Sequence, residues 1–175
     1  MATFNAPIVL LLSLASVAIM AAGKEPTTHL HFYMHDNISN PYATAVRVAQ
    51  GPRTSSAPGL YFGDIYVIDD PLTTGPSPSS PLVGRAQGFY AMASQDPADI
   101  ALLLTVNLVF TEGEYKGSTL AILSRDAILS PVRELPVVGG SGKLRLARGY
   151  VLMKTYSFNQ TLGDAILEWD VYVTN

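Results

Sequence analysis

The chain has no cysteine, so no disulfide can hold its fold together. Charged residues are also scarce, at 14% of the sequence, and the net charge is −3. A weakly acidic chain lacks the basic surface that attracts polyanions, and we expect no nucleic-acid partner. Nucleotide-binding motifs are absent as well. Stability must come from apolar burial and backbone pairing alone.

The first 23 residues contain no charged side chain, and positions 8–20 form an unbroken run of apolar and small residues. Such a run suits the hydrophobic region of a signal peptide and falls short of the roughly 20 residues that span a bilayer. The small residues at 21–23 predict cleavage after Gly23. We expect a signal peptide at 1–23, a single secreted domain at 24–175 and no stable membrane anchor. An uncleaved anchor is the alternative.

Two sequons agree with secretion. Asn37-Ile38-Ser39 and Asn159-Gln160-Thr161 each match the acceptor pattern for N-glycosylation. Both asparagines are therefore candidate glycosylation sites.

The rest of the sequence predicts strands separated by turns, because glycine and proline interrupt it too often for long helices. The predicted strands are 29–36, 43–49, 60–68, 82–92, 100–111, 118–124, 144–156 and 165–173. Segment 69–81 is predicted as a Pro/Ser-rich loop and segment 139–143 as a flexible turn. Eight short strands favour a sandwich or a barrel, and a closed barrel would remove exposed edges and enclose one small ligand.

The first predicted strand alternates between an apolar and a polar face. Phe32 and Met34 share one face with Asp36, whereas His29 and His31 lie on the other. An inward Asp36 would have a raised pKa and could serve as an acid; the alternative is a carboxylate that caps a turn. The histidines could bind a metal, but no further ligand at a suggestive spacing completes a site. A polar outer or intersubunit face is favoured, and no metal or cofactor is expected.

Three further residues are candidates for a site. Tyr90 shares a strand face with small residues and with Met92, and we expect this face to point inward. The small residues would leave space beside the Tyr90 ring unless it simply packs in the core. Asp126 and Arg133 bracket a predicted loop, and the arginine fork suits a phenolate, carboxylate or carbonyl oxygen. An ordinary surface ion pair is the alternative.

Several motifs in order resemble the plant dirigent family over nearly the whole mature chain. They are Phe-Tyr-Met-His-Asp at 32–36, Gly-Arg-Ala-Gln-Gly-Phe-Tyr at 84–90, Gly-Ser-Thr-Leu at 117–120, and Arg133 before Gly-Gly-Ser-Gly at 139–142. The resemblance implies an all-β, eight-stranded antiparallel β-barrel of the allene oxide cyclase type. It also implies a homotrimer (or homodimer) in the apoplast.

The resemblance further implies stereochemical control of phenoxy-radical coupling in lignan and phenylpropanoid biosynthesis. An external oxidase or laccase would generate the radicals from monolignols such as coniferyl alcohol, so no intrinsic oxidase activity is expected. One alternative is ring closure on a quinone methide with loss of water, as in pterocarpan formation. Another is a secreted, phenolic-binding defence barrel without turnover.

The family pattern implies catalytic roles for Asp36, Asp126 and Arg133, and substrate-binding roles for Tyr90 and Met92. Met92 stands where lignan-forming members commonly carry a second tyrosine, and the disulfide common in those members cannot form here. We therefore expect a member outside that subgroup.

Overall fold

The computed structural model describes residues 28–39, 41–53 and 61–174, so the predicted signal peptide lies outside the described residues. No helix in the described ranges is long and apolar enough to cross a membrane. These ranges form strands and one short 3-10 helix: β1 (Thr28–Asp36), β2 (Ala45–Ala49), β3 (Ile65–Thr73), β4 (Leu82–Met92), β5 (Ala101–Phe110), β6 (Thr119–Ala127), β7 (Arg133–Ser141), η1 (Gly142–Leu144), β8 (Arg148–Phe158) and β9 (Ala165–Thr174).

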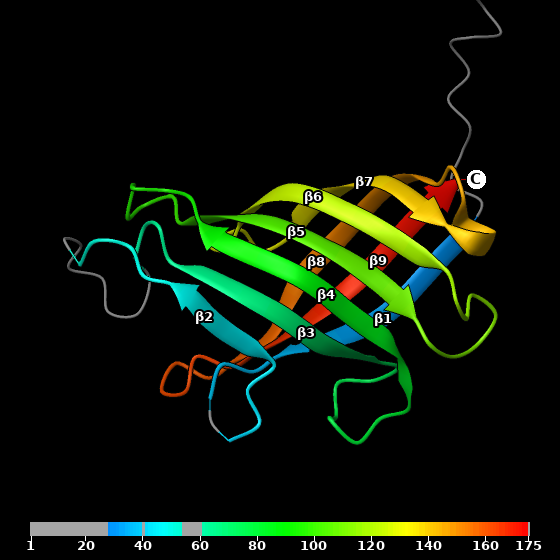
Figure 1. Ribbon diagram of the computed structural model, residues 1–175, viewed down its shortest axis with the longest axis horizontal. Helices are drawn as coiled ribbons and strands as arrows, with labels where there is room; N and C mark the ends of the chain where they lie inside the picture. The colour runs from blue at the N-terminus through cyan, green and yellow to red at the C-terminus, as the bar shows by residue number, and fades with distance from the viewer. Residues whose placement is uncertain (1–27, 40, 54–60, 175) are drawn as a thin grey trace, which may run out of the picture.

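The strands form one closed antiparallel barrel (Figure 1). The sheet runs β1-β9-β8-β7-β6-β5-β4-β3, and pairing of Tyr33 with Thr73 and of Met34 with Leu72 joins β1 to β3. The short strand β2 pairs with β3 outside this closed set. An eight-stranded antiparallel barrel, as expected, is therefore confirmed.

The described residues form nine strands, whereas eight were predicted, and two of the nine differ from the prediction. Strand β7 had no predicted counterpart and includes residues 139–141 of the predicted turn. Gly140 in this strand fits because a Cβ would come within 2.3 Å of the Leu144 carbonyl oxygen. Strand β3 begins later than predicted and continues through Pro71, which pairs with Arg85. Tertiary pairing thus overrides the local turn preference of glycine and proline.

An aromatic and aliphatic core fills part of the barrel interior. Phe32 stacks on Trp169 with ring centroids 6.1 Å apart and meets Phe110 edge-on at 6.3 Å. Burial of each such side chain contributes about 1.5–3 kcal/mol. The same inward-facing rows also carry polar residues, and these form the candidate site.

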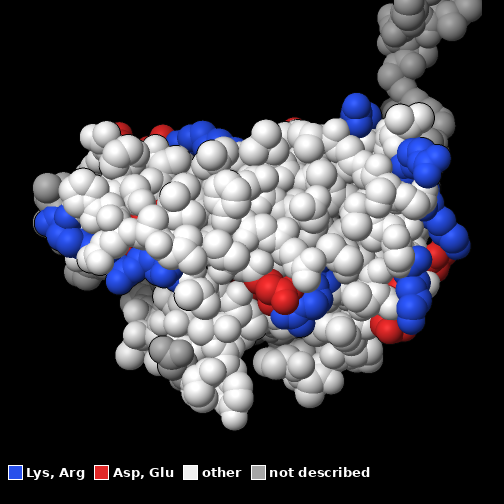
Figure 2. Space-filling view, viewed as in Figure 1, with Lys and Arg blue, Asp and Glu red and all other residues white. Residues whose placement is uncertain are grey.

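The outer face of β3–β6 is largely apolar. Val67, Phe89, Leu103 and Leu123 are exposed there. Figure 2 shows that this face carries few charged atoms. We call these four side chains the apolar face.

Candidate functional site

Strand alternation turns Tyr90 toward the barrel interior. Tyr90 is buried with Ala86 and Met92 along the same inward row of β4. Its ring stacks on that of Tyr66, the residue opposite it in β3, with centroids 5.0 Å apart. The predicted inward orientation of Tyr90 is confirmed, and the stack forms a flat aromatic wall inside the barrel.

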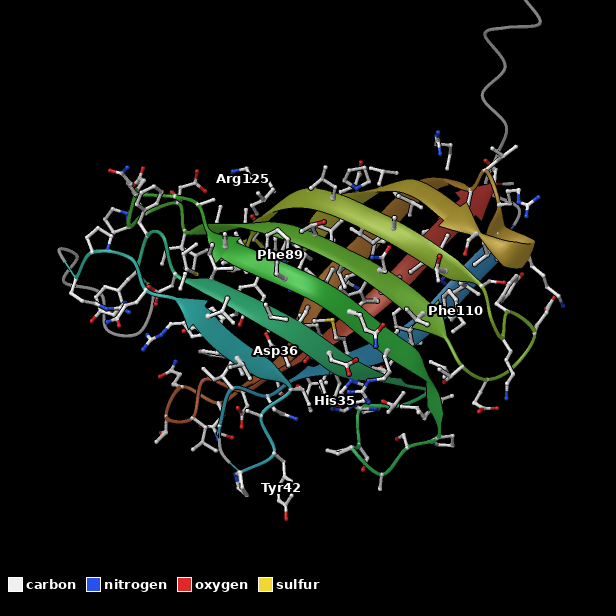
Figure 3. All side chains as sticks on the ribbon, viewed as in Figure 1. His35, Asp36, Tyr42, Phe89, Phe110 and Arg125 are labelled. Carbon is white, nitrogen blue, oxygen red and sulfur yellow. The ribbon has the colours of Figure 1, made fainter. Side chains whose placement is uncertain are left out.

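Asp36 and Asp70 form a carboxyl pair beside Tyr90. Asp36 ends β1, as Figure 3 shows, and the pairing of Met34 with Leu72 places it level with Asp70 of β3. Asp36 is half-buried as a residue, but its Oδ1 is buried and has no hydrogen-bond partner. Asp70 is fully buried, and its Oδ2 likewise has no partner. Each residue therefore presents an unpartnered carboxyl oxygen.

Burial dominates the acidity of this carboxyl pair. It raises the pKa of Asp36 to about 7, although a hydrogen bond from the Tyr90 hydroxyl acts in the opposite direction. Burial and then the negative charge of Asp36 raise the pKa of Asp70 to about 8, against a hydrogen bond from the Thr44 hydroxyl, which lies 2.5 Å from Asp70 Oδ1. Burial and the carboxylates also raise the pKa of Tyr90 far above its usual value. At neutral pH the pair therefore retains a transferable proton.

Asp126 and Arg133 form a second, buried cluster. Arg133 Nη1 lies 3.4 Å from Asp126 Oδ1, and both side chains are only 4% exposed. Arg133 Nη2 donates to Thr155 Oγ1 at 2.9 Å, whereas its Nε is buried without a partner. The surface-pair alternative is wrong, because both residues are buried within strands. Burial raises the pKa of Asp126, and Arg133 opposes this shift.

Met92 lies between the two clusters on the inner wall. It is opposite Leu102 in the β4–β5 ladder, and Leu102 is opposite Asp126 in the β5–β6 ladder. Within the described part of the chain, no recorded hydrogen bond or ion pair links the Asp36 cluster to the Asp126 cluster. The barrel thus presents an acid pair and a guanidinium on either side of an apolar strip.

Three residues that contact or line this site were not identified from the sequence, and one of them, Thr155, is exposed. Asp70 and Tyr66 face inward from β3, and Thr155 faces Arg133 from β8. In the sequence Ile68-Asp69-Asp70-Pro71-Leu72, strand alternation places Asp70 on the same face as Ile68 and Leu72. This segment was nevertheless predicted as a loop because it contains a proline. Recognition of the strand would have placed Asp70 on the inner face.

Two surface depressions lie outside this interior. One, of about 530 Å³, is lined by both sequon asparagines, Asn37 and Asn159. The other, of about 710 Å³, is lined by Phe62 and Leu102 and adjoins the wall next to Asp126. Neither lining includes Asp36, Tyr90 or Asp126. We assign the candidate site to the barrel interior because these three residues lie on the inward-facing rows of their strands.

Comparison with known proteins agrees with this architecture. The family model for dirigent-like proteins matches residues 27–174. Dirigent protein 21 of Arabidopsis thaliana is 52% identical over 147 residues, which cover 83% of this chain and 76% of the relative. Pterocarpan synthase 1 of Glycyrrhiza echinata is 45% identical over 159 residues, or 90% of this chain and 83% of the relative. The solved structure of the pterocarpan synthase dirigent protein PsPTS1 is 42% identical and aligns with a TM-score of 0.80 over 87% of this chain and 98% of its own.

Proposed function

The chain belongs to the dirigent family, and we propose that its barrel closes a ring on a quinone methide with loss of water. The observation that carries this proposal is the pair of unpartnered carboxyl oxygens on Asp36 and Asp70. A buried acid that stays protonated near neutral pH is the group such a dehydration needs. The similarity to pterocarpan synthases supports the same reaction.

The proposed reaction needs no oxidant. The substrate is a benzylic alcohol para to a phenol, as in an isoflavanol, with a second phenol in the same molecule. The Asp36–Asp70 pair protonates the benzylic hydroxyl, which leaves as water while the para phenol loses its proton, and a quinone methide results. The second phenol then adds to the benzylic carbon through its oxygen and releases its proton, while the quinone-methide carbonyl gains one. The net change is loss of one water.

The other interior residues suit binding and orientation of this substrate. Arg133 Nε, buried without a partner, can donate to the phenolate or carbonyl oxygen of the quinone methide. Asp126 holds the guanidinium in place. Tyr90 and Met92 supply an aromatic and an apolar surface against which the substrate rings lie. The same fixed orientation would determine which face of the benzylic carbon is attacked.

Stereoselective coupling of monolignol radicals is the second candidate. The stacked Tyr66–Tyr90 wall favours it, because it offers a surface for phenolic rings. An external oxidase or laccase would remove one electron and one proton from each coniferyl alcohol. Two radicals would then join by a carbon–carbon bond to give a bis-quinone methide, and the Asp36–Asp70 pair would assist its ring closure. Binding of phenolics without turnover is the remaining alternative.

Chiral chromatography separates these functions. Purified protein is incubated with an isoflavanol alone, and separately with coniferyl alcohol plus an oxidant. A single enantiomer from the isoflavanol without oxidant supports ring closure, whereas enantiomeric excess only with oxidant supports coupling. An unchanged ligand that binds supports the third alternative. Asp69→Asn is the control, because the Asp69 carboxylate is exposed and paired with Arg85. Loss of product in Asp36→Asn but not in Asp69→Asn would locate the reaction inside the barrel.

We also propose that the protein is secreted to the apoplast, glycosylated at Asn37 and Asn159, and assembled as a homotrimer. The apolar face offers a surface for contact between copies, since exposed apolar patches commonly mark interfaces. Light scattering on the protein and on Phe89→Glu would test the assembly. A trimeric mass that falls to that of a monomer in the variant supports it, and a monomeric mass in the parent protein contradicts it.

A further inference from the structure

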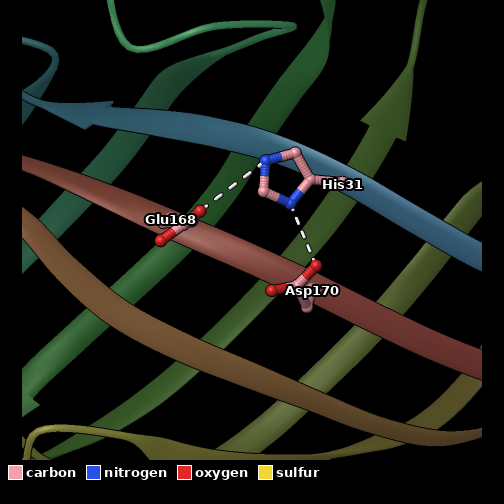
Figure 4. Close-up of side chains that lie close together, drawn as sticks. All are labelled: His31, Glu168 and Asp170. Carbon is pink, nitrogen blue, oxygen red and sulfur yellow. Dashed lines mark hydrogen bonds and ion pairs between the residues drawn. The ribbon is translucent and has the colours of Figure 1, made fainter.

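Two imidazoles and two carboxylates lie side by side on the outer face of β1 and β9. His31 is directly opposite Asp170 in the ladder; its Nδ1 lies 2.9 Å from Asp170 Oδ1 and its Nε2 lies 3.8 Å from Glu168 Oε1 (Figure 4). His29 Nε2 lies 2.8 Å from the same Asp170 oxygen. We propose that these four side chains bind a divalent transition-metal ion such as Zn²⁺.

The separations between the ligand atoms fit such an ion. A tetrahedral zinc site with bonds of about 2.1 Å places its ligand atoms roughly 3.4 Å apart. His29 Nε2 and His31 Nδ1 lie 2.8 and 2.9 Å from Asp170 Oδ1, somewhat closer than this value. The 3.8 Å contact with Glu168 is made by the other nitrogen of His31, and an imidazole binds one ion through a single nitrogen, so His31 or Glu168 must rotate to share the ion. One ligand atom each from His31, Glu168 and Asp170 lies within 4.8 Å of the others. Small side-chain rotations would therefore close the group around one ion, which replaces the protons now shared by the imidazoles and the carboxylates.

Neighbouring aromatic side chains hold these ligands in place. The His29 ring stacks on Tyr172, with centroids 4.5 Å apart and planes 8° from parallel. The Tyr33 hydroxyl donates to Glu168 Oε1 at 3.3 Å, and the His31 ring packs edge-on against Tyr33 at 5.3 Å. Partners of this kind orient metal ligands and raise affinity. The ligands also lie on paired strands, so binding orders little backbone.

The chemistry of the ligands selects the class of ion. Imidazole nitrogen with carboxylate oxygen suits Zn²⁺ or Cu²⁺, whereas Mg²⁺ and Ca²⁺ prefer oxygen alone. All four side chains remain partly exposed, between 21% and 49%, so an ion can reach them. The site is separate from the acid pair, which faces the opposite side of the sheet, and from the apolar face on β3–β6.

The competing interpretation is a cluster of hydrogen bonds that binds no metal, and titration calorimetry with Zn²⁺ distinguishes the two. The chain has three histidines, and His35 is only 2% exposed and bonded to Thr73, so an untagged protein offers little other imidazole to the ion. We expect one Zn²⁺ per chain and an affinity at least tenfold weaker in His31→Ala.

The controls are variants of similar chemistry elsewhere. Asp99→Asn removes an exposed carboxylate paired with Arg125 and should bind Zn²⁺ like the parent chain. Asp170→Asn should lose binding as His31→Ala does, and circular dichroism of both variants checks that the barrel is intact. Absence of saturable binding up to about 100 µM Zn²⁺, above the Kd range of specific transition-metal sites, would overturn the proposal. Equal affinity in parent, His31→Ala and Asp170→Asn would overturn it as well.

Discussion

Replacement of Asp36 by Asn removes the proposed proton donor and leaves the side-chain shape nearly unchanged. The pKa of Asp36 is raised to about 7 by burial, so at pH 6 about nine-tenths of the molecules carry the proton. In the parent protein the rate of ring closure should therefore be highest in mildly acid solution and fall about tenfold per pH unit above about 7–8, where the donor is lost. General acid catalysis contributes about 10²–10⁴-fold, and Asp36→Asn should lose an amount in this range.

The assay follows enantiomerically resolved product from an isoflavanol, without oxidant, between pH 5 and 9. Asp69→Asn is the matched control, because this neighbour of Asp70 points outward to Arg85 and should keep both the rate and the pH profile. A rate in Asp36→Asn within about twofold of the parent protein would refute the acid role. A parent profile that rises through pH 7 would refute it too, since it would indicate a base rather than an acid.

Further variants test the remaining contacts. The folded-state pKa of Asp70 is about 8, above its ordinary value of 3.8. The stability that the protonated side chain contributes is therefore present at low pH and is lost as the pH rises from about 4 to about 8. Asp70→Asn should flatten the fall in Tm across this window, as measured by calorimetry. Tyr90→Phe keeps the stack on Tyr66 but removes the hydrogen bond that lowers the pKa of Asp36, so the alkaline limb of the rate profile should move to higher pH. Arg133→Met leaves the carboxylate of Asp126 buried without its ion-pair partner, and the free energy of unfolding in urea should fall by about 3–5 kcal/mol. The double variant Arg133→Met/Asp126→Asn should recover most of this stability without recovering activity.

Local alternation made part of the site predictable. The pattern of β1 places Asp36 on the same face as Phe32 and Met34, and this face is the inner one. The pattern of β4 likewise predicts an inward Tyr90. Both predictions use only the period-2 geometry of a strand, which holds wherever the strand itself is recognised.

Long-range pairing made the rest unpredictable from the sequence. Asp70 was missed because Pro71 indicated a loop, yet the pairing of Pro71 with Arg85 keeps β3 intact. The sequence indicated His29 and His31 as possible metal ligands, but the carboxylate ligands were missed because Asp170 lies 139 residues from His31 in the chain. No spacing rule connects such residues, since only the β1–β9 register brings them together.

The central claim is that the folded barrel keeps a protonated carboxyl pair at neutral pH. A ¹³C NMR titration of the aspartate carboxyl carbons measures this directly, with Asp36→Asn and Asp70→Asn to assign the two signals. We predict that the pair titrates in steps near pH 7 and 8 in the parent protein. Titration of both carboxyls near their ordinary value of 3.8 would contradict the account, because no interior acid would then be available for ring closure.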